Sequence, residues 1–140
     1  LSFDFDIDVP VAMVSDGPFA FSAQPGTGRG GEGSALQSSN QFVNSSQSVV
    51  SLNLVAGPDA QISFWVKVSS EEDYDELIVT LNDNVPSRYS GNIDWVQVTY
   101  DLAEGDNSIS WNYSKDGSVS EGVDTAWIDD VSFTGACLAD

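Results

Sequence analysis

Alternation of apolar and polar residues is the feature that most restricts the fold of this chain. Residues 2–9 place Phe3, Phe5 and Ile7 on one face and aspartates on the other. The same period of two recurs at 48–55, 62–68, 95–102, 108–113 and 126–133. A period of two is typical of half-buried strands, and no long stretch has helical periodicity. Turn residues recur about every eight to twelve positions, so we predict an all-β, antiparallel two-sheet β-sandwich.

The length of the chain suits a single domain. Its 140 residues, 41% of them hydrophobic, are enough to bury a core without disulfides. We place this domain at residues 1–135 and expect a tail or the start of a linker at 136–140. Cys137 is the only cysteine, and we expect a tail thiol or half of a bridge to a neighbouring domain. The chain starts without a signal-peptide pattern, so we interpret it as a module covalently linked to other domains.

The charge balance argues against several classes of partner. Lys and Arg number 4 against 22 Asp and Glu, giving a formal net charge of -18. Such a field repels nucleic acid, anionic membranes and polyanionic polymers, and no apolar run is long enough to span a membrane. We therefore expect no nucleic-acid partner, no membrane insertion and, for any polysaccharide ligand, a neutral one. Histidine is absent and no catalytic motif is present, so we expect no enzyme activity.

Two adjacent acids, Asp129 and Asp130, interrupt the last alternating stretch. Adjacent strand residues face opposite ways, so one of the two is expected to point toward the interior or its edge. A bare carboxylate is costly there. In a chain with few bases, a bound cation is the simplest way to offset the charge of a buried carboxylate, and oxygen-rich sites select Ca²⁺. We therefore expect calcium as a cofactor of this strand.

The tryptophans are expected to belong mainly to the core. Trp95 and Trp127 lie in strand-like runs and are predicted to be buried. Trp111 alternates with Ile109 and Tyr113, so these three side chains are predicted to share one buried face.

Two further groups of polar residues stand out. Tyr89 lies in a predicted exposed loop beside Arg88, one of the four bases, and this pair is the expected ligand contact because aromatic faces stack on sugar rings. The acidic turn at 71–76 is expected to be solvated, with a second cation as the alternative. Within and beyond that turn we expect Asp75, Asp116 and Asp124 to organise loops through hydrogen bonds.

Several motifs between residues 60 and 133 resemble those of a known class of module. They are ISFWVKVSS at 62–70, Tyr74-Asp75, Asp94-Trp95, ISWNYSKD at 109–116 and DTAWIDDV at 124–131. Together they resemble the MAM-like and cleaved-adhesin-like jelly-roll accessory modules of secreted bacterial enzymes and surface adhesins. The resemblance implies the jelly-roll form of the sandwich and a secreted or cell-surface location.

The resemblance also implies where the rest of a calcium site would lie. Such modules carry an acidic first strand and then a Ser/Gly-rich loop. Asp4 and Asp6 occupy the first place here, and Gly31 and Ser34 lie in the second. With Asp129 and Asp130 these are the expected metal ligands. A solvated acidic face is the alternative for the first-strand aspartates.

The expected function is non-catalytic binding. We predict a calcium-stabilised module that tethers a larger protein to a polysaccharide or cell-surface glycan. The alternative is a protein–protein adhesion module or a structural spacer of a bacterial surface protein. A glycan binder should expose a flat aromatic beside polar groups, whereas a spacer should bury all its tryptophans.

Overall fold

The computed structural model describes residues 2–3, 13–15, 17–31, 33–117 and 123–139. Within these residues all regular structure is β-strand, and every strand pair is antiparallel. The strands are β1 (Ser2–Phe3), β2 (Met13–Val14), β3 (Ser22–Pro25), β4 (Ser34–Gln37), β5 (Gln47–Ser69), β6 (Glu76–Leu81), β7 (Asn84–Ser90), β8 (Asn92–Asp101), β9 (Gly105–Ser114) and β10 (Thr125–Leu138). The predicted all-β sandwich is confirmed.

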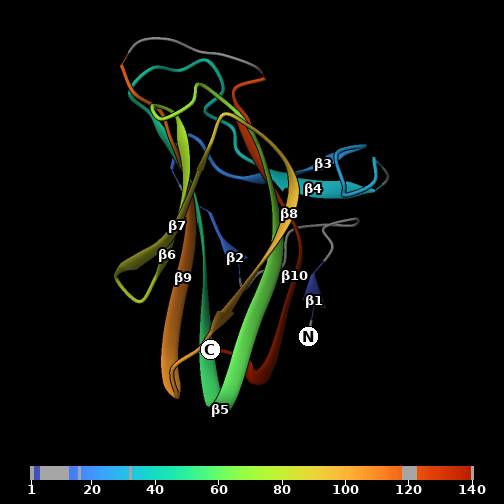
Figure 1. Cartoon of the computed structure of the whole chain (residues 1–140), viewed down its shortest axis with the longest axis vertical. Coiled ribbons are helices and arrows are strands. Elements are labelled where there is room, and N and C mark those ends of the chain that lie inside the picture. Colours follow the sequence, from blue (N-terminus) through green and yellow to red (C-terminus); the bar gives the residue numbers. More distant parts are fainter. Residues whose placement is uncertain (1, 4–12, 16, 32, 118–122, 140) are drawn as a thin grey trace.

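The long strand β5 belongs to both layers of the sandwich. Its first half pairs with β9, which continues to β6 and β7, and its second half pairs with β8 and β10. In Figure 1 the two halves meet at the bottom of the view and diverge upward. The bend falls at Gly57-Pro58-Asp59, a sequence typical of turns, and Asp59 has a φ of 59° there. Even-numbered residues are buried along both halves, so both layers face one core.

The core confirms one part of the tryptophan prediction and corrects another. Ile109, Trp111 and Tyr113 are all buried on one face of β9, and Trp111 packs edge-on against Phe64 at 5.2 Å between ring centres. Trp127 is also buried, with 9% of its surface exposed. Trp95 is only half-buried and lies outside the core cluster, so its prediction was wrong. Alternation along β8 turns Val98 and Tyr100 toward the core and Trp95 toward the other face, next to a register shift between β8 and β5.

The last strand extends further than the sequence suggested. The expected tail began at residue 136, but Ala136, Cys137 and Leu138 pair with Ala56, Val55 and Leu54 of β5. A second register shift near Gly135 lets β10 follow β5 around its bend, and a Cβ at Gly135 would lie 3.1 Å from the Ala60 backbone. Cys137 is exposed. No helix within the described residues has the length and hydropathy of a membrane span.

Candidate functional site

A cavity of about 510 Å³ lies at the end of the sandwich where β5 ends and β8 begins, the upper end in Figure 1. It is lined by Lys67, Val68, Ser69, Asn92, Ile93, Asp94, Val123 and Trp127. An indole, two valines and an isoleucine form apolar wall, and amide, hydroxyl, carboxylate and ammonium groups provide polar contacts. A second cavity, of about 400 Å³ near Asn53 and Asp106, has no aromatic side chain among its lining residues.

The aromatic wall of the cavity is held in place from two sides. The Trp127 indole Nε1–H donates to Gln37 Oε1 of β4 at 2.9 Å. The Lys67 ammonium lies 5.4 Å from the centre of the same ring, within the range of a cation–π contact. The two residues are direct neighbours across β5 and β10. The ring is therefore fixed before any ligand arrives.

The polar wall is similarly preformed. The Ser69 hydroxyl accepts a hydrogen bond from the Val123 N–H at 2.9 Å and lies 3.3 Å from Asn92 Oδ1. Asp94 Oδ1 accepts from the Trp95 N–H at 2.8 Å. Asn92 and Asp94 are both exposed, so their remaining donors and acceptors face solvent. This arrangement suits recognition of hydroxyl groups on a ligand that stacks against an apolar wall.

A buried ionic network begins at Asp124, the residue that follows Val123 of the cavity lining. The Lys115 ammonium contacts Asp124 Oδ2 at 2.6 Å and Asp75 Oδ2 at 3.0 Å, and none of these side chains is exposed. The Tyr113 hydroxyl donates to Asp124 Oδ1 at 2.7 Å. The Phe42 N–H donates to Asp124 Oδ2 at 2.6 Å, which ties the loop after β4 to the start of β10. The loop-organising roles expected of Asp75 and Asp124 are confirmed by these contacts.

The network holds Lys115, Asp124 and Tyr113 each in one charge state. Burial opposes the charge of Lys115, but hydrogen bonds and charges from Asp124 and Asp75 outweigh it and raise the lysine pKa. Burial would also raise the pKa of Asp124, yet donors from Lys115, Tyr113 and Phe42 lower it. Burial, and then the bond to Asp124, raise the pKa of Tyr113. Around neutral pH the lysine and the aspartate are therefore charged and the phenol is neutral.

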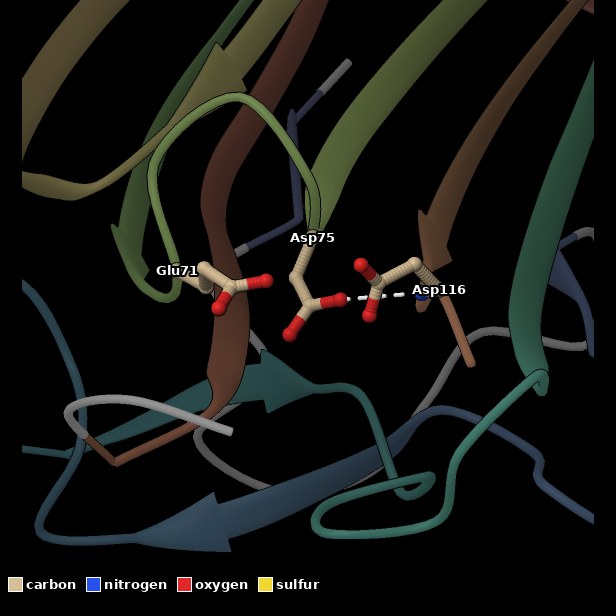
Figure 2. A group of neighbouring side chains, drawn as sticks. All are labelled: Glu71, Asp75 and Asp116. Atoms are coloured by element: carbon tan, nitrogen blue, oxygen red, sulfur yellow. Dashed lines mark hydrogen bonds between the residues drawn. The ribbon is translucent and has the colours of Figure 1, made fainter. Parts of the chain in front are cut away.

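Three carboxyl groups gather next to this network. Glu71, Asp75 and Asp116 each place an oxygen within 4.8 Å of the others, and Figure 2 shows them pointing toward one another from the turn after β5 and the end of β9. Asp75 Oδ1 accepts from the Asp116 N–H at 2.9 Å. The acidic turn is therefore only partly the solvated turn that the sequence suggested, because Asp75 is fully buried.

The two strand acids that carried the calcium expectation share one basic partner. A register shift follows Asp129, and Asp130 has a φ of 49°, so strict alternation is broken at this point. The Arg29 N–H donates to Asp129 Oδ2 and the Arg29 Nε donates to Asp130 Oδ2, both at 2.9 Å. Asp129 is buried and Asp130 is about one-third exposed. One acid does point inward, as predicted. Arg29, whose Cζ lies 4.1 Å from the centre of the Trp65 ring, offsets the negative charge of the pair.

The other expected metal ligands are only partly described. Asp4 and Asp6 lie outside the described residues. Ser34 is buried at the start of β4, and Gly31 is exposed and donates its N–H to the Gly28 carbonyl at 2.8 Å. The loop that carries Gly31 also carries Arg29, which contacts both strand acids. Carboxylate, hydroxyl and carbonyl oxygens are the donors that Ca²⁺ takes, but the Arg29 side chain already contacts Asp130, and calcium at this strand stays a prediction.

Arg88 and Tyr89 lie on strand β7, whereas the sequence suggested an exposed loop. Arg88 is exposed and pairs with Glu76 at 3.3 Å. Tyr89 is half-buried and packs against the core, next to Tyr100, whose pKa burial raises to about 12. Alternation along the strand sends the two side chains to opposite faces. The pair is therefore not adjacent to the cavity, whose lining includes neither residue.

Sequence reasoning expected no ligand contact from any residue of the cavity, and in the buried network it missed Lys115 and Phe42. Lys67 and Asp94 lie in motifs that carry the family resemblance, but neither motif pointed to a ligand contact, and Asn92 lies in no motif. Lys115 follows Tyr113-Ser114 and precedes an acid, a pattern that resembles any polar strand end. One signal was present in the sequence: the chain has only 4 bases and 22 acids, so each base is expected to pair with a carboxylate.

Comparison with protein-family models gave no match, and neither did comparison with curated proteins. Solved structures share the fold. The K1 cleaved adhesin domain of Lys-gingipain from Porphyromonas gingivalis W83 has a TM-score of 0.69 at 15% identity, over 96% of this chain and 97% of that one. The CBM22-2 xylan-binding domain of Paenibacillus barcinonensis Xyn10C has a TM-score of 0.64 at 15% identity, over 96% and 98%.

The secreted serine protease VesC from Vibrio cholerae has a TM-score of 0.62 at 24% identity. This chain is covered over 82% of its length in that match but spans only 24% of VesC. The expected resemblance to cleaved-adhesin modules is therefore confirmed at the level of the fold. At these identities the likeness concerns the fold and not the ligand.

Proposed function

We propose that this chain is a non-catalytic, carbohydrate-binding module of a larger secreted or surface protein. The observation that carries the proposal is the cavity with the Trp127 wall. Its size, its apolar wall of Val123, Ile93 and the 9% of the Trp127 surface that is exposed, and its exposed Asn92 and Asp94 match what a sugar ring requires: an apolar wall and polar groups for the hydroxyls. Several domains with this fold are described as carbohydrate-binding, including a xylan-binding one.

The same cavity argues for binding rather than cleavage. Hydrolysis of a glycosidic bond takes two carboxyl groups that flank the bond. Asp94 is the one acid that lines the cavity in the described part of the chain. Asp75 and Asp124 are buried, are engaged by Lys115 and do not line the cavity. A bound sugar would therefore meet a single carboxylate.

Calcium is the cofactor that we propose for stability. Asp129 and Asp130 would supply carboxylate oxygens and the Arg29–Ser34 loop would supply carbonyl and hydroxyl oxygens, with Asp4 or Asp6 completing the set. An ion that binds only the folded state stabilises it by about 2.7 kcal/mol at a hundred times Kd. We expect the melting midpoint to be higher in Ca²⁺ than in EDTA, and Asp129→Asn to abolish that difference.

Glu104→Gln serves as the control for the calcium test, because it removes an equal charge from an exposed acid between β8 and β9 that is not among the expected ligands. The same midpoint in Ca²⁺ and EDTA for the unmodified chain would rule the ion out as a stabiliser.

Binding itself is tested by calorimetric titration with soluble neutral and acidic polysaccharides. We expect a neutral glycan to bind, because the net charge of -18 opposes polyanions. Asn92→Ala should weaken that binding about fivefold to tenfold, because the variant loses one hydrogen bond to the ligand. Arg88→Ala, at the position that the sequence suggested, is the matched control and should bind normally. Absence of binding across the panel would reject the carbohydrate proposal in favour of an adhesion or spacer module.

A further inference from the structure

Phe42 combines three properties that rarely occur together. Its side chain is 62% exposed, which is high for a large apolar residue. Its φ is 61°, in the left-handed region that glycine and asparagine adopt readily and bulky residues avoid. Its N–H is held at 2.6 Å by Asp124, a fully buried carboxylate. The backbone at Phe42 therefore adopts a conformation of unfavourable free energy, and the ring is exposed to water.

The loop around Phe42 is tied down rather than loose. The Val43 N–H donates to the Asn40 carbonyl at 3.1 Å, and the Ser45 N–H donates to the Asp116 carbonyl at 2.6 Å. Asn40 is buried and donates to the Tyr113 carbonyl at 2.9 Å. The loop thus presents the exposed ring from a fixed frame. Strained residues that the surrounding structure holds in place are found mainly at functional sites.

Phe42 is also contiguous with the proposed sugar cavity. The Gln41 side chain donates to the carbonyl of Val123, and Val123 lines the cavity. Val123 is next in sequence to Asp124, which holds the Phe42 N–H. The exposed side chains of Val43, next to Phe42 in sequence, and of Val123, in the cavity lining, add apolar surface at the two places.

We infer that Phe42 is a second stacking platform and that the ligand is a glycan chain of several sugar rings, which runs from the Trp127 cavity over Val123 to Phe42. The inference rests on the proposed function and names the form of its ligand. A sugar chain fits better than a protein partner, since the apolar surface consists of one ring and two valines, whereas stable protein interfaces bury about 800 Å² on each side. The flanking Gln41, Asn44 and Ser45 add amide and hydroxyl groups that suit sugar hydroxyls.

The test compares long and short ligands on variants that keep the backbone. Phe42→Gly accepts the positive φ without strain, so its melting midpoint should equal or exceed that of the unmodified chain. Its affinity for a neutral hexasaccharide should fall about tenfold, as for one lost aromatic contact, while its affinity for the corresponding disaccharide should not change. Phe42→Tyr should bind both ligands normally. Val85→Ala, at an exposed apolar residue of β7, is the control.

The titrations use xylo-, cello- and manno-oligosaccharides of both lengths. If the unmodified chain binds a hexasaccharide and Phe42→Gly binds it equally well, the inference fails and the proposed function stands. If the unmodified chain binds no glycan, both fail together. Equal loss of disaccharide and hexasaccharide binding in Phe42→Gly would also overturn the inference, because the ring would then act at the cavity rather than beyond it.

Discussion

At the scale of single residues, Lys115 shows how a very acidic chain uses a scarce base. The side chain is fully buried between Asp75 and Asp124, and each acid has a further partner: Asp116 N–H for the first, Tyr113 and Phe42 for the second. Buried ions are tolerated when their hydrogen bonds are complete. Because Asp124 also holds Phe42, the network links the core to the exposed loop beside the cavity.

Replacement of Lys115 by methionine should be strongly destabilising. Methionine fills similar space but leaves two buried carboxylates without their cation, which typically costs about 3–5 kcal/mol. Arg88→Met breaks an exposed pair with Glu76 and should cost about 1 kcal/mol or less. Urea unfolding of both variants measures the difference. Similar midpoints for the two variants would mean that the buried network contributes little to stability.

At the scale of strands, the period-two pattern predicted β5, β9 and β10 because alternation is a local property of the sequence. It could not predict where strands depart from ideal pairing. The shift after Asp129, where Asp130 takes a positive φ, brings two adjacent acids to one arginine 100 residues away. The partner of Lys115 in the turn after β5 is 40 residues away. Such pairings depend on the assembled sheets, which is why the cavity and the role of Lys115 could not be predicted from the sequence.

Trp111 and Trp95 should respond differently to truncation. Trp111 is fully buried against Phe64, so Trp111→Ala should cost about 3–5 kcal/mol. Trp95 is half-buried beside a register shift, so Trp95→Ala should cost roughly 1–2 kcal/mol. Chemical unfolding at one temperature compares them. An equal or larger loss for Trp95 would show that the edge strand β8 contributes more to the core than its burial indicates.

At the scale of the whole molecule, the net charge of -18 and the buried network act on stability in opposite directions as pH falls. Protonation of exposed acids relieves repulsion. Asp124 has a lowered pKa, so its contribution is complete above the ordinary carboxyl value of about 3.9 and is lost as pH falls through its folded pKa. Lys115 has a raised pKa, so its contribution is complete below about 10.4 and is lost as pH rises through its folded pKa.

The difference in unfolding free energy between the unmodified chain and Asp124→Asn isolates this network, because both carry the same exposed acids. We expect that difference to be constant from about pH 5 to pH 9 and to shrink at lower pH, where Asp124 becomes protonated. Urea unfolding at a series of pH values measures it. A difference that grows below pH 4 would contradict the assignment of a lowered pKa to Asp124.

The central claim, that the Trp127 cavity binds sugar, can be tested most directly by nuclear magnetic resonance during a glycan titration. The indole N–H of Trp127 and the side-chain amide of Asn92 report on the cavity, and the indole N–H of buried Trp111 reports on the distant core. We predict that a neutral oligosaccharide shifts the Trp127 and Asn92 signals in a saturable way and leaves Trp111 unchanged. Saturable binding that shifts signals of Arg88 and Tyr89 on β7, with Trp127 unchanged, would contradict the account.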